Sequence, residues 1–144
     1  MRAWRRFWRL PAVDRRLVVE TTLALALARV VVMMLPLRGL GWLASRRVRA
    51  SAPPARADVT RRIRWAVTAC ASYVPWRALC FEQGLAAQLL LRRCGIPAVL
   101  HVGAALDDQT GFAAHAWVRD GDTDVVGCEI ADQFSLLTSF PPRT

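Results

Sequence analysis

The chain has 144 residues, the length of one ordinary domain, which is enough to bury a single hydrophobic core. Its formal net charge is +9, and every basic side chain is Arg because the sequence contains no Lys, which indicates a compositional bias more than a functional patch. Hydrophobic residues make up 54% of the chain and concentrate in its first third, so part of this region is expected to face a partner or a bilayer.

Three basic runs mix Arg with Trp or aliphatic residues: "RAWRRFWRL", "SRRVRA" and "TRRIRW". Such runs occur in nucleic-acid-binding arms and in helices at membrane surfaces, although the solvated faces of N-terminal helices are the favoured reading. No zinc finger, RNA-recognition signature or helix-turn-helix spacing accompanies them. We therefore do not expect nucleic acid as a partner.

The apolar segment from residue 17 to 35, "LVVETTLALALARVVVMML", is long enough to span a membrane. Glu20 and Arg29 interrupt it, and a charge near the centre of a bilayer costs about 3 kcal/mol or more. A buried or partner-facing helix is therefore favoured, with an interfacial or spanning helix as the alternative. Pro36 and Gly39 then break the pattern.

A second break lies at "ASAPPARADVT", where Pro53 and Pro54 predict an extended linker. Asp58 or Thr60 is expected to cap the helix that follows, and this helix should stop at Pro75. These features divide the chain into a helical N-terminal region, residues 1–70, and a core, residues 71–144.

The pattern changes at Cys80. The run "CFEQGLAAQLLLRRCG" has apolar residues at helical spacing and ends in Gly95, which predicts one helix despite Gly84 inside it. Next come "IPAVLHVGAAL" and "FAAHAWVRD", read as strands, and "DVVGCEI", read as the hairpin partner of the second strand. A helix followed by an antiparallel sheet predicts an α+β fold with the helix packed on the sheet.

The four cysteines, Cys70, Cys80, Cys94 and Cys128, form no C-x-x-C pair, and the chain has two histidines. We therefore expect neither a metal nor a cofactor. No small-residue cleavage site follows the apolar run cleanly, so a secretory signal is not expected, and free thiols favour a reducing cytoplasm.

Cys80 occupies the N-terminus of the expected helix, where unpaired backbone N–H groups favour a thiolate. A lone cysteine is more often apolar filler, so a catalytic reading needs a general base. Strand alternation in "AAHAWV" takes His115 off the most apolar face and places it beside Trp117. An isolated histidine is more often a core residue whose hydrogen bonds are satisfied. Here that interpretation competes with a specific catalytic pairing of His115 with Cys80. His101 is the rival base, with no carboxylate at hairpin spacing.

A catalytic histidine also needs an acceptor that fixes its tautomer. A turn centred on Gly121 and Asp122 puts the residue opposite His115 between Gly127 and Glu129. The turn aspartates lie at the far end of the hairpin, on the order of 13 Å away. Glu129 is therefore the best-placed carboxylate, although Cys128 competes for the opposing position. The other carboxylates that stay open are Asp124 and Asp132.

The stretch "CFEQGLAAQLLLRRCGIPAVLHVGA", followed by "FAAHAWVRDGDTDVV", resembles the transglutaminase-like cysteine proteases of lasso-peptide biosynthesis, in their split form called B2 proteins. The resemblance covers Cys80 to about Phe140. It implies a papain-like or transglutaminase-like core in which Cys80 is the nucleophile and His115 the base. The Asp of the family has no clean counterpart, because "VVGCE" stands where it is expected; Glu129 is the expected substitute.

The resemblance also implies an activity, the hydrolytic removal of a leader peptide from a lasso-peptide precursor. The oxyanion would bind at the helix start, with Trp76 or Gln83 as a further donor. The split form lacks the domain that recognises the leader, so a separate leader-binding, B1-type protein and an ATP-dependent macrolactam synthetase are the implied partners. The protein is expected in the cytoplasm, with peripheral membrane contact. The alternative is a noncatalytic membrane-associated or scaffold protein that uses the apolar, Arg-rich N-terminal region.

Overall fold

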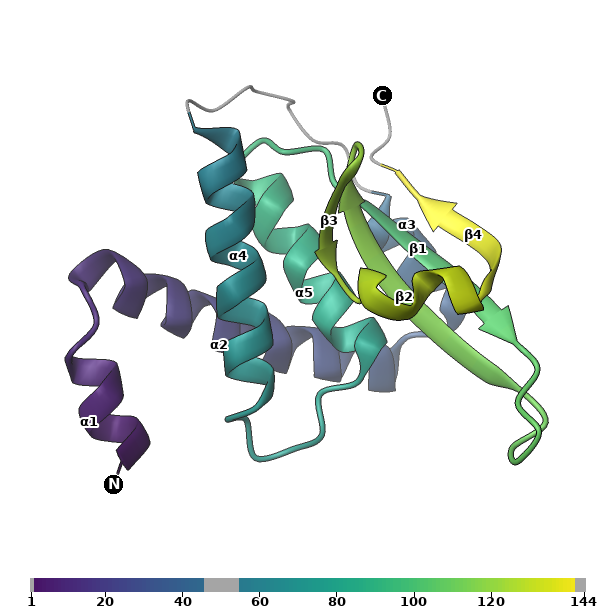
Figure 1. The fold of residues 1–144 in the computed structure, drawn as a ribbon, viewed down its shortest axis with the longest axis horizontal. Helices are drawn as coiled ribbons and strands as arrows, with labels where there is room; N and C mark the ends of the chain where they lie inside the picture. Colours follow the sequence, from purple (N-terminus) through teal and green to yellow (C-terminus); the bar gives the residue numbers. More distant parts are fainter. Residues whose placement is uncertain (1, 46–54, 142–144) are drawn as a thin grey trace.

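A computed structural model describes residues 2–45 and 55–141 (Figure 1). Within these ranges the helices are α1 Arg2–Trp8, α2 Ala12–Met34, α3 Leu37–Ala44, α4 Arg56–Ala71 and α5 Cys80–Arg93. They are followed by β1 Val99–Ala105, β2 Ala113–Asp120, β3 Thr123–Val126, the 3-10 helix η1 Cys128–Gln133, and β4 Ser135–Phe140. The strands form one antiparallel sheet in the order β3-β2-β1-β4. The predicted α+β fold is confirmed.

Helix α5 packs directly on the sheet, and Gly84 makes the close approach possible. A Cβ atom on Gly84 would lie 2.8 Å from Cδ1 of Leu100 in β1 and 3.6 Å from Cγ2 of Val118 in β2. Glycine inside a helix costs about 1 kcal/mol relative to alanine. Here that cost accompanies a closer contact between helix and sheet, around which Leu85 and Leu91 are fully buried.

Helix α2 packs on α4 and α5 along one face, which consists of Thr21, Leu25 and Ala28. By length and composition α2 could cross a membrane. An 18-residue window of this helix has a mean hydropathy of 2.0, and 17% of that window is buried inside the protein. The guanidinium of Arg29 donates a hydrogen bond to the buried carboxylate of Glu82 in α5 over 2.8 Å. The expected buried or partner-facing helix is thus buried along one face and open along the other.

The helices and the sheet share one hydrophobic core, in which Leu25 and Ile63 join Leu85 and Leu100. This core extends across the division drawn at residue 70, so that division stays a prediction. The expected linker at Pro53 and Pro54 lies outside the described residues.

Helix α4 differs from expectation at both ends. It begins at Arg56 after Ala55, whose φ is 64°, and no side chain caps it. Asp58 instead accepts a hydrogen bond from Arg61, and the hydroxyl of Thr60 is buried without a partner among the described residues. The helix ends at Ala71, before Pro75 is reached.

The C-terminal part of the sheet also differs from the hairpin read from the sequence. Strand β3 stops at Val126 because Gly127, with a φ of 75°, turns the chain into η1. The chain then returns as β4, which the sequence analysis did not anticipate, and pairs with β1. Figure 1 shows η1 crossing in front of β2 and β4 at the outer edge of the sheet.

Arg92, near the end of α5, joins distant parts of the chain. Its guanidinium donates to the carbonyl of Ala44 in α3, to that of Ala98 over 3.1 Å and to that of Phe140 in β4 over 2.9 Å. Burial lowers the pKa of Arg92 to about 10. The side chain therefore stays charged at neutral pH and satisfies buried carbonyl groups.

Candidate active site

Cys80 is the first residue of α5, where the sequence placed it. Leu79 precedes it in an extended conformation, and the first α-helical hydrogen bond runs from the N–H of Gln83 to the carbonyl of Leu79 over 3.0 Å. The earlier N–H groups of the first turn have no acceptor inside the helix. Together with the helix dipole they favour negative charge beside the Cys80 thiol.

The two side chains expected to assist the oxyanion differ in their surroundings. Gln83 donates its side-chain N–H to the carbonyl of Ala78 over 2.9 Å, so it holds the loop before Cys80 in place. The indole N–H of Trp76 is buried and has no hydrogen-bond partner in the described part of the chain. A buried donor without a partner costs about 1–3 kcal/mol, so Trp76 is the side chain that gains from an incoming acceptor.

His115 lies near the start of β2, opposite Gly103 of β1. Its strand neighbour Ala116 is buried in the core, whereas His115 is half-buried. The imidazole stacks on Trp117 with ring centroids 6.1 Å apart, and it contacts Phe134 at 5.0 Å. Aromatic neighbours on two sides restrict the ring orientation and keep water away.

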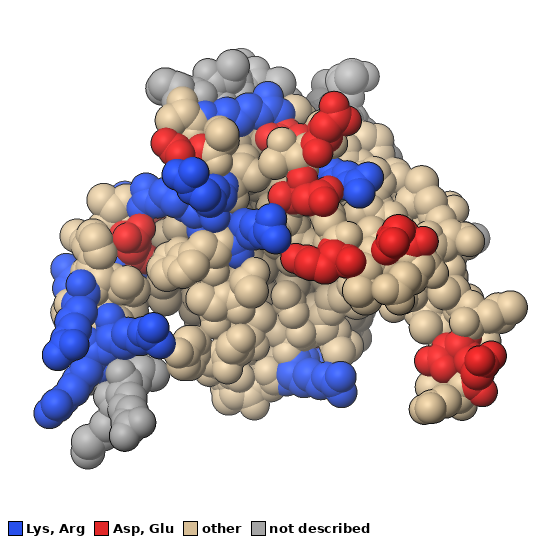
Figure 2. Space-filling model, in the orientation of Figure 1, with Lys and Arg blue, Asp and Glu red and all other residues tan. Residues whose placement is uncertain are grey.

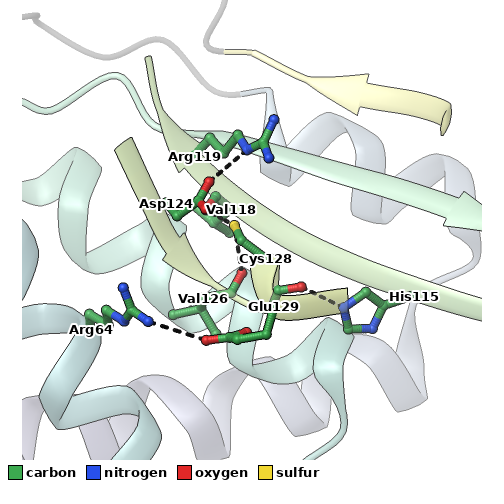
Figure 3. Close-up of polar contacts among 9 residues, drawn as sticks. Arg64, His115, Val118, Arg119, Asp124, Val126, Cys128 and Glu129 are labelled. Atoms are coloured by element: carbon green, nitrogen blue, oxygen red, sulfur yellow. Dashed lines mark hydrogen bonds and ion pairs between the residues drawn. The ribbon is translucent and has the colours of Figure 1, made fainter. Parts of the chain in front are cut away.

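The decisive contact of His115 is with a backbone group. Its Nε2 lies 2.6 Å from the carbonyl oxygen of Gly127, just beyond the end of β3 (Figure 3). A carbonyl oxygen can only accept, so Nε2 carries the proton and Nδ1 carries the free lone pair. The ring is thereby held in the tautomer whose Nδ1 can act as a base.

Glycine is required at position 127. The backbone φ of 75° lies in the left-handed region, and a Cβ atom there would be 2.6 Å from the carbonyl oxygen of Ala116. The missing side chain therefore lets the Gly127 carbonyl reach His115. The sequence predicts that the residue opposite His115 lies between Gly127 and Glu129. The residue types alone, however, do not show that a main-chain carbonyl is the acceptor.

The expected acceptor, Glu129, is engaged elsewhere. It lies in η1, its side chain is 65% exposed, and its carboxylate contacts Arg64 of α4 at 3.3 Å (Figure 3). The hairpin register that favoured Glu129 fails because β3 ends at Val126. This corrects the placement of Glu129 as the partner of His115.

The alternatives to Glu129 do not take that position either. Asp124 pairs with Arg119 at 2.9 Å, toward the turn end of the hairpin, and Asp132 is exposed in η1. Cys128 donates its S–H to the carbonyl of Val118 over 3.2 Å, and burial raises the pKa of this thiol. Cys128 is therefore a structural thiol.

The other cysteines differ from Cys80 in their surroundings. All four are free thiols. Cys70 is buried in α4, 3.7 Å from the carbonyl of Val18, and burial raises its pKa. Cys94 is the C-cap residue at the opposite end of α5 and is exposed. Among the four cysteines, Cys80 is the one that begins an α-helix.

The rival base, His101, belongs to a different cluster. Its Nδ1 lies 2.8 Å from the hydroxyl of Ser139 in β4, and its ring stacks on Trp117 at 5.7 Å. Burial, and then the charge of Arg119, lower the pKa of His101. The imidazole of His101 thus links strand β1 to strand β4.

The structure brings the two main candidates onto elements that pack together, since α5 contacts β2. No hydrogen bond joins the Cys80 thiol to the His115 ring within the ranges that the structure describes. Catalytic contacts are often long in a free enzyme and shorten when substrate binds.

The chain matches a known protein family. The family model of the transglutaminase-like superfamily matches residues 21–139, from within α2 to within β4. The chain belongs to the transglutaminase-like superfamily. Neither a curated protein nor a solved structure matches the chain significantly. The matched span contains Cys80, His115 and Gly127, and this superfamily commonly includes cysteine peptidases.

Proposed function

We propose that the chain is a cysteine peptidase that removes the leader peptide from a lasso-peptide precursor. The observation that carries the peptidase chemistry is the hydrogen bond from His115 to Gly127, because it leaves Nδ1 free as a base on the strand against which the Cys80 helix packs. Superfamily membership supports this chemistry. The lasso-peptide substrate rests on the sequence resemblance from Cys80 onward.

In the proposed mechanism, Nδ1 of His115 takes the proton of the Cys80 thiol as the two groups approach in the substrate complex. The sulfur attacks the scissile carbonyl carbon, and the N–H groups at the start of α5 bind the oxyanion together with the indole N–H of Trp76. The resulting imidazolium protonates the leaving amine, which departs and leaves a thioester on Cys80. Gly127 accepts from Nε2–H throughout and holds the ring in place.

Deacylation uses the same groups. A water molecule gives a proton to Nδ1 and attacks the thioester carbonyl, and the second tetrahedral intermediate releases a carboxylic acid and the Cys80 thiol. An amine in place of water would give acyl transfer, and the resemblance favours hydrolysis. The proposed partners are the precursor leader, a separate leader-binding protein of the B1 type and the ATP-dependent macrolactam synthetase, in the cytoplasm.

The test is incubation of the chain with a leader-containing precursor and its leader-binding protein, followed by mass spectrometry of the products. We expect cleavage to be lost in Cys80→Ala and in His115→Ala, each with an unchanged circular dichroism spectrum. Cys94→Ala, at the other end of the same helix, is the matched control and should cleave normally. A folded Cys80→Ala protein with full activity would reject the proposal, and a wild-type chain that cleaves nothing would favour the noncatalytic scaffold.

A further inference from the structure

The face of α2 that points away from the core is a continuous apolar stripe. Its members lie three or four residues apart along the helix, with two adjacent methionines at the end, and are 47–77% exposed: Val19, Leu23, Leu27, Val30, Met33 and Met34. At a rise of 1.5 Å per residue the stripe is about 23 Å long. A surface of this kind usually marks an interaction site.

The polar group on this face is already satisfied. The hydroxyl of Thr22 donates to the carbonyl of Val18 over 2.8 Å, so it needs no water. Glu20, on the flank, is neutralised by Arg16 at 2.9 Å and by Arg93 at 3.7 Å. The stripe can therefore be buried in an apolar environment without leaving a polar side chain unpaired.

Positive charge gathers at one end of the stripe. Arg5 and Arg6 of α1 are exposed, as is Arg9 just after this helix, and Arg16 lies one turn before Val19. Arg15, on the same turn of α2, lies 5.3 Å from the ring centroid of Trp8, which is itself 54% exposed. Figure 2 shows one group of Arg side chains over α1 and another over α4, whereas most acidic side chains on that face lie over the sheet half.

A spanning orientation conflicts with the contacts of the opposite face. Crossing a bilayer would pull Thr21, Leu25 and Ala28 away from α4 and α5 and would break the ion pair between Arg29 and Glu82. The carboxylate of Glu82 would then be buried in the protein without its partner, which costs about 3–5 kcal/mol. The helix can lie on a bilayer with its inner face still packed.

Net charge also distinguishes between the two candidate partners of the stripe, a second copy of the chain and a bilayer. A second copy would bring together two chains that each carry a net charge of +9. A bilayer rich in anionic lipid offers acyl chains to the stripe and negative headgroups to the Arg residues at its end. An apolar helix face with basic and Trp side chains beside it is the usual composition of interfacial helices.

We propose that the outer face of α2, together with α1, docks the protein on the surface of an anionic bilayer. The helix lies parallel to the surface, and the sheet and the Cys80 end of α5 remain in water. This inference goes beyond the proposed peptidase activity, and its test has no cleavage readout, so either can fail without the other.

The experiment is co-sedimentation of the purified full chain with vesicles of phosphatidylcholine containing about one third phosphatidylglycerol, compared with vesicles of phosphatidylcholine alone. We expect binding to the anionic vesicles, weakened at least about tenfold by Leu23→Gln/Leu27→Gln. The matched control is Leu136→Gln/Leu137→Gln on β4, where the two side chains are 58% and 64% exposed against 64% and 54% for Leu23 and Leu27. The control should bind like the wild type.

A charge variant tests the basic end. Arg5→Gln/Arg6→Gln should weaken binding to anionic vesicles about tenfold or more, and raised salt should do the same to the wild type. Equal binding of the wild type and the α2 variant would overturn the proposal. So would protein that resists extraction by alkaline carbonate, which indicates a spanning helix. A dimer that Leu23→Gln/Leu27→Gln dissociates, without vesicle binding, would assign the stripe to a second copy instead.

Discussion

The Nε2–H group of His115 donates to the carbonyl oxygen of Gly127 over 2.6 Å, and this backbone oxygen takes the place that the hairpin register had given to Glu129. A main-chain carbonyl fixes the tautomer and the orientation of the ring as a carboxylate does. It brings no charge, however. The orientation of His115 consequently depends on the backbone conformation at Gly127 more than on any acidic side chain.

Gly127→Ala should therefore damage both the fold and the activity. The added Cβ meets the carbonyl of Ala116 and the left-handed backbone is strained, so we expect a loss of about 2–4 kcal/mol in the free energy of unfolding and a large fall in kcat/KM. Gly121→Ala is the matched control, because its φ is 58° and its Cβ would meet nothing within 4 Å. It should lose about 1 kcal/mol in urea denaturation and keep its activity.

Glu129→Gln should leave cleavage close to the wild-type rate. The carboxylate is exposed and its ion pair with Arg64 spans 3.3 Å, so the effect on stability should stay within about 1 kcal/mol. Steady-state kinetics on the precursor measures the first effect and urea denaturation the second. A hundredfold loss of kcat with normal folding would return Glu129 to the role of orienting His115.

The ion pair between Arg29 and Glu82 should matter far more than other pairs on α2. Glu82 is 1% exposed, so Arg29→Met leaves a buried carboxylate without its partner and should lower the free energy of unfolding by about 3 kcal/mol. Arg16→Met removes an exposed pair from the same helix and should cost at most about 0.5 kcal/mol. Similar midpoints in urea for both variants would mean that the Glu82 site is already open to water.

Stability should fall in mild acid, in part because of His101. Burial and the charge of Arg119 lower the pKa of His101 below the 6.5 of a free side chain, so the unfolded chain binds the proton more readily than the folded one. This contribution is fully present above about pH 6.5 and is lost as the pH falls from there toward the folded-state pKa. His101→Gln should flatten the decline in unfolding free energy between pH 7 and pH 5, and parallel curves for the two proteins would contradict this assignment.

The parts of the fold that local pattern controls could be predicted from the sequence. The helix from Cys80 to Arg93 and the strand that carries His115 followed from apolar spacing and from glycine at the helix end. Strand β4 could not be found in this way, because its residues 135–138 are exposed on both faces and show no alternation.

The elements that carry the candidate site residues were predictable to the same degree, and the catalytic roles of Cys80 and His115 stay a prediction. Cys80 and His115 are side chains with recognisable chemistry, and a helix start and a strand place them. The acceptor for His115 is a carbonyl that every residue possesses, and only the turn at Gly127 selects which one is used. Glu129 was the best carboxylate in sequence, but a bend of the backbone decided the contact.

The strand order has a consequence for how the protein is made. Strand β4 is the last element of the described chain, yet it pairs with β1, the first strand, and the guanidinium of Arg92 also reaches the carbonyl of Phe140 at its end. During synthesis β1 and Arg92 leave the ribosome well before these acceptors exist. The nascent chain must therefore wait with one side of β1 unpaired, and its last strand closes the fold.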